Sequence, residues 1–269
     1  MIGRSLISNM ALSLALAGAA HQAARAQDLR DFCADRPGKA TPACILDVGR
    51  LQLETGLADA ALQRGGGQRD DVYTIGQTEI RYGIASHTEL EAVVTPWSIE
   101  RSRDAGGRTR RSGFGDLALG FRTALSDPDG KGTLVSLQAF ATAPTGTHHQ
   151  GAGDWEGGVR LPVSADLGGG FSLGVTPEAD LRRDGDAHGR HLAFSTAVSV
   201  GHALGPLSVG AELWAEGDED PGGHVNSASF DLSAAWMAAK DLQLDAGLNA
   251  GLTHDTPDLE LYVGVARRF

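Results

Sequence analysis

The sequence lacks a long uninterrupted run of apolar residues anywhere after its N-terminal leader. Apolar runs after Gln27 are short and are broken by Gly, Ser, Asp, Glu or Arg. A membrane-spanning helix needs about 20 mostly apolar residues, so no such helix is predicted for the mature chain. Only helices and closed barrels satisfy their backbone hydrogen bonds in lipid. The sequence therefore leaves two choices, a soluble fold or a β-barrel.

Basic residues are outnumbered by acidic ones, with 23 Lys and Arg against 34 Asp and Glu, and the formal charge is −11. The mature chain is more acidic still, because Arg4 and Arg25 leave with the leader. An acidic chain without a basic helical face excludes nucleic acid as the expected partner.

Cysteine is scarce, and the two that exist, Cys33 and Cys44, flank residues 34–43. In an exported protein such a pair predicts a disulfide that closes a small loop. A redox site needs a close CxxC pair, which is absent. A zinc site needs further ligands, and no His lies nearby.

The N-terminus has the three parts of a secretory leader. Arg4 supplies the positive charge, residues 9–20 form a short apolar core, and Ala24-Arg25-Ala26 is a small-x-small cleavage site. A retained anchor is the alternative, but the apolar core is too short to span a membrane. We predict a signal peptide over 1–26, a periplasmic segment over 27–48 and a barrel over 49–269.

From Gly49 onward the apolar residues recur at every second position. In 241–252, for example, Leu242, Leu244 and Leu248 alternate with polar residues or glycine. This period indicates strands with one apolar and one polar face. The predicted strands are 50–62, 71–83, 88–99, 114–125, 133–143, 155–166, 171–182, 191–203, 207–216, 226–237, 241–252 and 258–269.

The predicted connections alternate between short and long, as do the periplasmic turns and outer loops of an outer-membrane barrel. The expected fold is an all-β, transmembrane, antiparallel up-and-down barrel of about twelve strands. A soluble β-sandwich or barrel shares the alternation, but its wide centre needs large side chains, and aromatics make up only 6% of the chain. We also expect the terminal Phe269 to be the assembly signal read by the barrel assembly machinery, although Arg267 departs from the usual pattern.

Aromatic residues gather near the predicted strand ends, as in the interfacial girdles of such barrels. Strict alternation nevertheless points Trp97 and Trp214 inward. A bulge near Pro96 would reset Trp97, whereas Trp214 has no such explanation. Pro162 and Pro177 fall in predicted strands, where each removes a ladder hydrogen bond and marks a bulge or a misplaced boundary.

Several short motifs resemble a known family. They are Cys33-x-x-Arg36-Pro37-Gly38, Thr41-Pro42-x-Cys44, Gly49-Arg50-Leu51-Gln52-Leu53-Glu54-Thr55-Gly56, Glu79-Ile80-Arg81-Tyr82-Gly83-Ile84, Gly113-Phe114-Gly115-Asp116-Leu117 and Tyr262-Val263-Gly264. Together they are similar to bacterial outer-membrane proteins of the MetA-pathway phenol degradation family. The resemblance implies a barrel that takes up or handles small organic compounds, aromatic ones included. It implies no catalytic residues.

Charged residues on the polar strand faces are expected to point into the lumen and to line a solute path. The residues predicted for this path are Glu54, Glu79, Arg81, Glu89, Glu91, Asp116, Arg122 and Arg160. Acids outnumber bases on this face, which favours cations or neutral solutes. The alternative is a set of salt bridges that closes a narrow barrel.

Three other groups have weaker chemical signals. The arginines of the predicted loop 100–113 suit lipopolysaccharide phosphates, or else form a solvated loop. His148 and His149 lack acids at ligand spacing, so no metal is expected. His191 shares a strand with Ser195 and Ser199, but no orienting acid is identifiable and no GxSxG motif occurs, so no catalytic residue or cofactor is expected.

The sequence thus predicts a channel or transporter for small organic molecules in the bacterial outer membrane. Its expected partners are outer-membrane lipid and lipopolysaccharide, the assembly machinery and a small-molecule solute. A barrel with a closed lumen that binds or supports, and a barrel enzyme acting on lipid or aromatic substrates, remain the two alternatives.

Overall fold

The computed structural model describes residues 29–186 and 189–269. The chain divides into two units, Met1–Asp31 and Phe32–Phe269. The described part of the first unit, 29–31, contains no helix or strand, and the predicted signal peptide lies outside the described residues. No helix among the described residues is long and apolar enough to cross a membrane.

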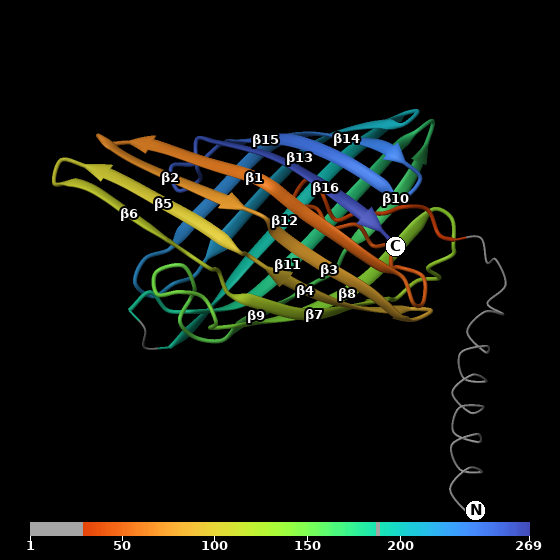
Figure 1. The fold of residues 1–269 in the computed structure, drawn as a ribbon, viewed down its shortest axis with the longest axis horizontal. Helices are drawn as coiled ribbons and strands as arrows, with labels where there is room; N and C mark the ends of the chain where they lie inside the picture. Colours follow the sequence, from red (N-terminus) through yellow and green to blue (C-terminus); the bar gives the residue numbers. More distant parts are fainter. Residues whose placement is uncertain (1–28, 187–188) are drawn as a thin grey trace, which may run out of the picture. The chain divides into compact units, whose positions relative to one another are not determined.

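From Leu51 onward the described residues of the second unit form strands that pair antiparallel (Figure 1). The strands are β1 (Leu51–Gly65), β2 (Gln68–Ile75), β3 (Gln77–Ala85), β4 (Thr88–Val94), β5 (Trp97–Asp104), β6 (Gly107–Gly113), β7 (Leu117–Ala124), β8 (Thr133–Ala143), β9 (Glu156–Arg160), β10 (Val163–Gly168), β11 (Phe171–Arg183), β12 (Arg190–Leu204), β13 (Leu207–Asp218), β14 (Val225–Ala239), β15 (Leu242–Gly251) and β16 (Leu259–Arg268).

Four short breaks divide what are otherwise continuous strands. Strands β2 and β3 both pair with β1 and are separated only by Gly76, which has a φ of 73° that favours glycine. Strands β4 and β5 pair with the two halves β3 and β2, and strands β7 and β6 pair in turn with β4 and β5. Strands β9 and β10 both pair with β11, so each of these couples is one strand with a short break. The sheet therefore consists of twelve strands, as predicted. It closes because β16 pairs with β1, from Gln52 opposite Arg268 to Leu62 opposite Leu259.

Proline explains one of these breaks. Pro162 separates β9 from β10, and Pro177 lies opposite this break in β11. Neither residue can donate a ladder hydrogen bond. Their carbonyl oxygens still accept, from Leu161 N at 3.0 Å for Pro177 and from Ser136 N at 3.0 Å for Pro162. The expectation of an irregularity at Pro162 is confirmed, and Pro177 remains within its strand.

The burial pattern is inverted relative to that of a water-soluble protein. The largest fully buried side chains include Arg81, Arg122, Gln52 and Glu54, whereas large apolar side chains on most of the strands are exposed, Leu213 by 57%. Apolar surface outside and charge inside suit a barrel in lipid. This inversion decides against the soluble β-sandwich or barrel.

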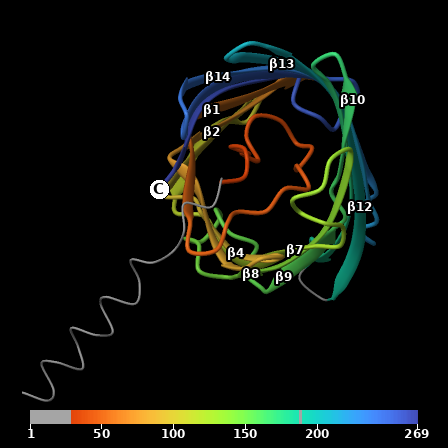
Figure 2. The same ribbon diagram turned by 90° about the vertical axis from the view of Figure 1, so that its right-hand side faces the viewer.

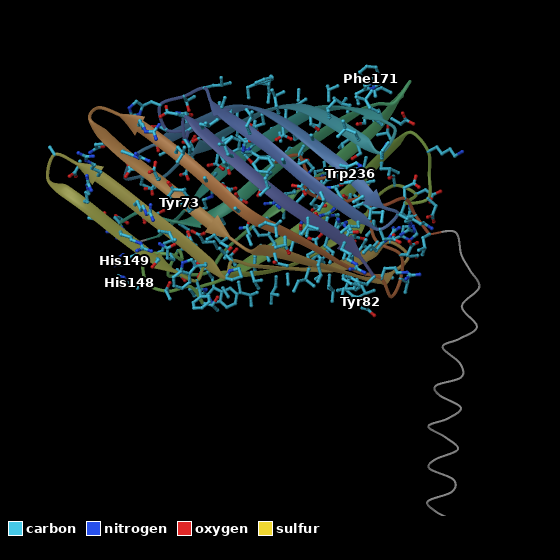
Figure 3. The ribbon with its side chains drawn as sticks, turned by 45° about the horizontal axis from the view of Figure 1, so that its top comes forward. Tyr73, Tyr82, His148, His149, Phe171 and Trp236 are labelled. Atoms are coloured by element: carbon cyan, nitrogen blue, oxygen red, sulfur yellow. A yellow bond between two sulfur atoms is a disulfide. The ribbon has the colours of Figure 1, made fainter. Side chains whose placement is uncertain are left out.

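Two aromatic residues test the predicted alternation. Trp97 pairs with Ile75 in register, is 40% exposed and packs edge-on against Phe114, with ring centroids 5.9 Å apart. The break at 95–96 therefore resets Trp97 to the outer surface, as the bulge hypothesis predicts. Tyr82 and Phe171 also project from the outside of the barrel (Figure 3).

The prediction that residues 100–113 form a loop is wrong. Residues 97–104 and 107–113 form the β5–β6 hairpin, in which Arg103 pairs with Arg108 and Arg101 with Arg110. Arginines stand at positions where alternation would place apolar residues, so the sequence pattern does not indicate a strand here. Ladder hydrogen bonds to the neighbouring strand β2 nevertheless extend the sheet.

A charge placed on the lipid-facing side at mid-strand should destabilise the barrel. Leu232, at the middle of β14, is 43% exposed, and Leu232→Arg should lower the free energy of unfolding by about 2–4 kcal/mol. Leu207 lies near the inner end of β13, where the same substitution should cost about 0–1 kcal/mol. Reversible urea unfolding in lipid vesicles measures both values. Equal costs at the two positions would contradict the lipid-facing assignment.

Candidate functional site: the lumen and its N-terminal plug

Residues 32–48 lie inside the ring of strands, and we call them the plug (Figure 2). The predicted disulfide is present and closes the loop between Cys33 and Cys44, whose Cα atoms are 6.5 Å apart. The plug has no helix or strand, so its position depends on contacts with the barrel wall. The sequence led us to expect this segment in the periplasm, and the structure places it in the lumen instead.

The strongest contacts of the plug surround Arg81 of β3. This side chain is fully buried. Its Nη1 lies 3.0 Å from Glu54 Oε1 and 3.1 Å from Asp35 Oδ1 of the plug, and its Nη2 lies 2.8 Å from Glu89 Oε1. A buried guanidinium carries a large desolvation cost unless it is well paired. Here three carboxylates on two wall strands and the plug offset that cost.

Arg122 of β7 repeats this arrangement beside Arg81. It is also fully buried, and its Nη2 lies 2.9 Å from Glu91 Oε1. Nη1 donates to Asp35 Oδ1 at 2.9 Å and to Pro42 O at 3.0 Å, and Nη2 pairs with Asp35 Oδ2. Asp35 thus bridges two buried arginines.

The ionisation of Asp35 depends on these arginines. Burial alone would raise the pKa of Asp35, but the charges of Arg122 and Arg81 hold that pKa below its usual range. A lowered folded-state pKa adds stability that is present above the unfolded pKa of about 4 and is lost as the pH falls through the folded value. Asp35 therefore remains an anionic anchor at neutral pH.

On the opposite wall, the plug contributes cations and backbone donors. Arg36 Nη2 lies 2.9 Å from Asp245 Oδ1 of β15, and Lys39 Nζ lies 2.8 Å from Asp231 Oδ2 of β14. Glu212 of β13 accepts from Lys39 N at 2.8 Å and from Ala40 N at 2.7 Å. Opposite charges therefore hold the plug to both sides of the barrel.

Trp214 of β13 points into the lumen, as strict alternation predicts. The Lys39 ammonium lies 5.3 Å from the centre of its ring, within the range of a cation–π contact. The sequence offered no explanation for an inward tryptophan. The reason is that the ring packs against a charged residue of the plug.

The predicted path residues fall into three places. Glu54, Arg81, Glu89, Glu91 and Arg122 form the buried cluster around Asp35. Glu79 and Arg160 line the cavity above the cluster, where Arg160 Nε lies 2.8 Å from Glu178 Oε2 of β11.

Asp116 lies apart from the other predicted path residues, in the break between β6 and β7. It accepts from Gly146 N and Ala152 N, both at 2.7 Å. These bonds fasten the loop 144–155 to the barrel. Asp116 therefore holds a loop in place. The alternation of residues along one strand does not reveal a contact of this kind.

Two cavities lie on either side of the plug. The outer cavity has a volume of about 460 Å³ and is lined by plug residues and by Glu79, Glu178, Arg182 and Trp214 among others. The inner cavity, about 290 Å³, is lined by plug residues and by residues of β11 to β16. Arg36 and Gly38 line both, so the plug is the partition between them.

Sequence reasoning missed the acids beside His191 of β12. The ring Nδ1 lies 2.9 Å from Asp184 Oδ1, and Nε2 lies 2.8 Å from Asp218 Oδ1. Asp218 also pairs with Arg182 at 3.1 Å. The acidic run 216–220 is visible in the sequence, but only the pairing of β12 with β13 brings it to the histidine. These contacts link the outer ends of three strands.

Residues 34–269 match the family described as "Putative MetA-pathway of phenol degradation". No curated protein is significantly similar in sequence.

Solved structures share the architecture at low sequence identity. The COG4313 outer membrane channel from Pseudomonas putida F1 is 17% identical, with a TM-score of 0.65 over 87% of this chain and 99% of that one. The β domain of the Bordetella autotransporter BrkA is 13% identical, with a TM-score of 0.55 over 83% and 100%. The KdgM porin is 7% identical, with a TM-score of 0.51 over 81% and 99%. These similarities establish the barrel fold.

Removing the charge of Asp35 should loosen the plug. Asp35→Asn leaves Arg81 and Arg122 buried with one carboxylate fewer, at a cost of about 3 kcal/mol. Hydrogen exchange at Lys39 N and Ala40 N should then rise by about 100-fold. Asp154→Asn, which breaks a half-exposed ion pair with Arg190, should change exchange in the plug by less than about fivefold. Unchanged exchange in Asp35→Asn would show that this anchor does not hold the plug.

Proposed function

Because the chain belongs to the MetA-pathway phenol degradation family, we propose that this outer-membrane β-barrel is a channel for small organic molecules. The observation that carries the proposal is the pair of lumen cavities separated only by an irregular segment. A barrel that merely supports other structures needs no such space.

The outer cavity has the dimensions and lining of a solute-binding chamber. Its volume of about 460 Å³ falls within the roughly 300–1,000 Å³ of small-molecule sites. The ring of Trp214 offers an apolar face, while Arg160, Arg182 and Glu178 offer charged groups around it. An aromatic ring with one polar substituent matches this mixture, because it combines a stacking face with a hydrogen-bonding group.

The acids of the outer cavity set a preference among solutes. Asp35, Glu54, Glu79, Glu178 and Glu216 line it beside four basic residues. Most of these charges already have an ion-pair partner, either in the cavity lining or elsewhere in the barrel wall, which leaves a weak negative field. Neutral and cationic solutes should therefore pass more readily than anions.

Passage requires the plug to move, since it separates the two cavities. The plug has few backbone ladder contacts and is held by ion pairs. Such contacts can exchange for water when a solute enters. A permanently closed lumen remains the second candidate, favoured by the fully buried cluster around Arg81 and Arg122.

Weakening the plug should raise the conductance of the barrel. Arg36→Gln with Lys39→Gln removes the ion pairs to Asp245 and Asp231, and should increase the mean single-channel conductance in planar bilayers about twofold or more. Phenol uptake into vesicles should rise in parallel.

The control is Arg190→Gln with Arg267→Gln, which removes the same charge from exposed positions outside the outer cavity and should leave both readouts unchanged. No current and no phenol uptake, for either the natural protein or the plug variant, would reject the channel in favour of the closed barrel.

A further inference from the structure

The hairpins β1–β2 and β5–β6 extend the sheet at the end of the barrel opposite the C-terminus (Figure 1). Their register aligns four arginines across four neighbouring strands, with Arg64 opposite Arg69, Arg69 opposite Arg103, and Arg103 opposite Arg108. Residues directly opposite each other in a sheet project from the same face. These arginines therefore form one continuous row.

The register of β1 with β16 shows which face this is. Leu62 lies opposite Leu259 and Ala60 opposite Leu261, and Leu261 is 46% exposed on the outside of the barrel. Arg64 is two residues beyond Leu62, so alternation places it on the same outer face. The arginine row is therefore directed away from the lumen, toward the surrounding membrane.

The next row along this face is still charged, and the row after it is not. Asp71, Arg101 and Arg110 lie opposite one another below the arginine row, and Tyr73, Ile99 and Ser112 lie below these. The Arg101 guanidinium lies 5.3 Å from the centre of the Tyr73 ring, which confirms that the two share a face. The order of rows from arginine to aromatic is that expected at the boundary between headgroups and acyl chains.

We call the six arginines Arg64, Arg69, Arg101, Arg103, Arg108 and Arg110 the arginine face. Its single acid, Asp71, lies 2.6 Å from Arg69 Nη2 and is 4% exposed. Among the described residues, no acid forms an ion pair with Arg64, Arg103 or Arg108, and all three are exposed. Adjacent like charges repel, so this arrangement favours an anionic partner from outside the chain.

We propose that the arginine face binds the phosphate groups of lipopolysaccharide in the outer leaflet. Guanidinium forks match phosphate oxygens two at a time. Side chains opposite each other on neighbouring strands lie about 5 Å apart, so two arginines can hold one phosphate. The apolar residues below the face place those phosphates at the depth where the acyl chains of the same lipid begin.

Binding of lipid A to the detergent-purified full chain tests the site. The variant is Arg64→Gln, Arg103→Gln and Arg108→Gln together, which avoids Arg69 because Asp71 depends on it. Its matched control is Arg50→Gln, Arg111→Gln and Arg267→Gln, three arginines outside the face. We expect the variant to bind bisphosphorylated lipid A at least about tenfold more weakly, about 1.4 kcal/mol, and the control to bind like the natural protein.

A second binding measurement tests whether the phosphates are required. Dephosphorylated lipid A should lose most of its affinity for the natural protein. Equal binding of the variant and the control would overturn the proposal. Equal binding of dephosphorylated lipid A, or of phosphatidylglycerol vesicles, would overturn it as well. If the triple variant does not fold, Arg108→Gln alone, at an exposed position of β6, should weaken binding in the same direction. Channel conductance should not change in any of these variants, which separates this proposal from the channel.

Discussion

The attraction between the charges of the plug and those of the barrel wall is the interaction on which the lumen depends. Asp35 bridges Arg81 and Arg122, both fully buried, while Arg36 and Lys39 reach acids on the other side. Without Asp35, each of these buried guanidinium groups would lose a direct ion pair, and the wall cluster would lose its link to the plug. The plug and the wall therefore stabilise each other, and the division of the lumen into two cavities follows from this pairing.

The same principle, charge inside and apolar surface outside, orders the rest of the barrel. Leucine and valine face lipid along the long strands, and polar residues at alternate positions face the lumen. At the end of the barrel opposite the C-terminus, the rule reverses on the β5–β6 hairpin, where arginines take the outer face. The outer surface along the strands therefore suits acyl chains, and the inner surface suits the charged plug.

The sequence predicted the parts of the fold that depend on local alternation. Twelve strands, their approximate bounds, the Cys33–Cys44 disulfide and the reset of Trp97 all follow from period-two patterns or from neighbouring residues. It did not reveal the hairpin over 97–113, because seven of its residues are charged and break the apolar alternation. Irregular strand ends of this kind are stabilised by pairing with neighbours, which one strand alone does not show.

The position of the plug could not be predicted from local sequence patterns, for a different reason. Arg36 pairs with Asp245, 209 residues away, and Lys39 pairs with Asp231, 192 residues away. These residues meet only because the barrel closes around the plug, and nothing in the sequence of residues 32–48 alone indicates their partners. The same holds for His191, whose acids come from a loop and from the next strand.

The pairing of Lys39 with Asp231 offers the most direct test of the plug. Their charged atoms lie 2.8 Å apart, so a carbodiimide should join them with an amide bond in the natural protein embedded in vesicles. Mass spectrometry of the digest should then identify a peptide containing both residues. If Lys39 instead reacts freely with water-soluble amine reagents and no such peptide forms, the segment does not occupy the lumen and the account is wrong.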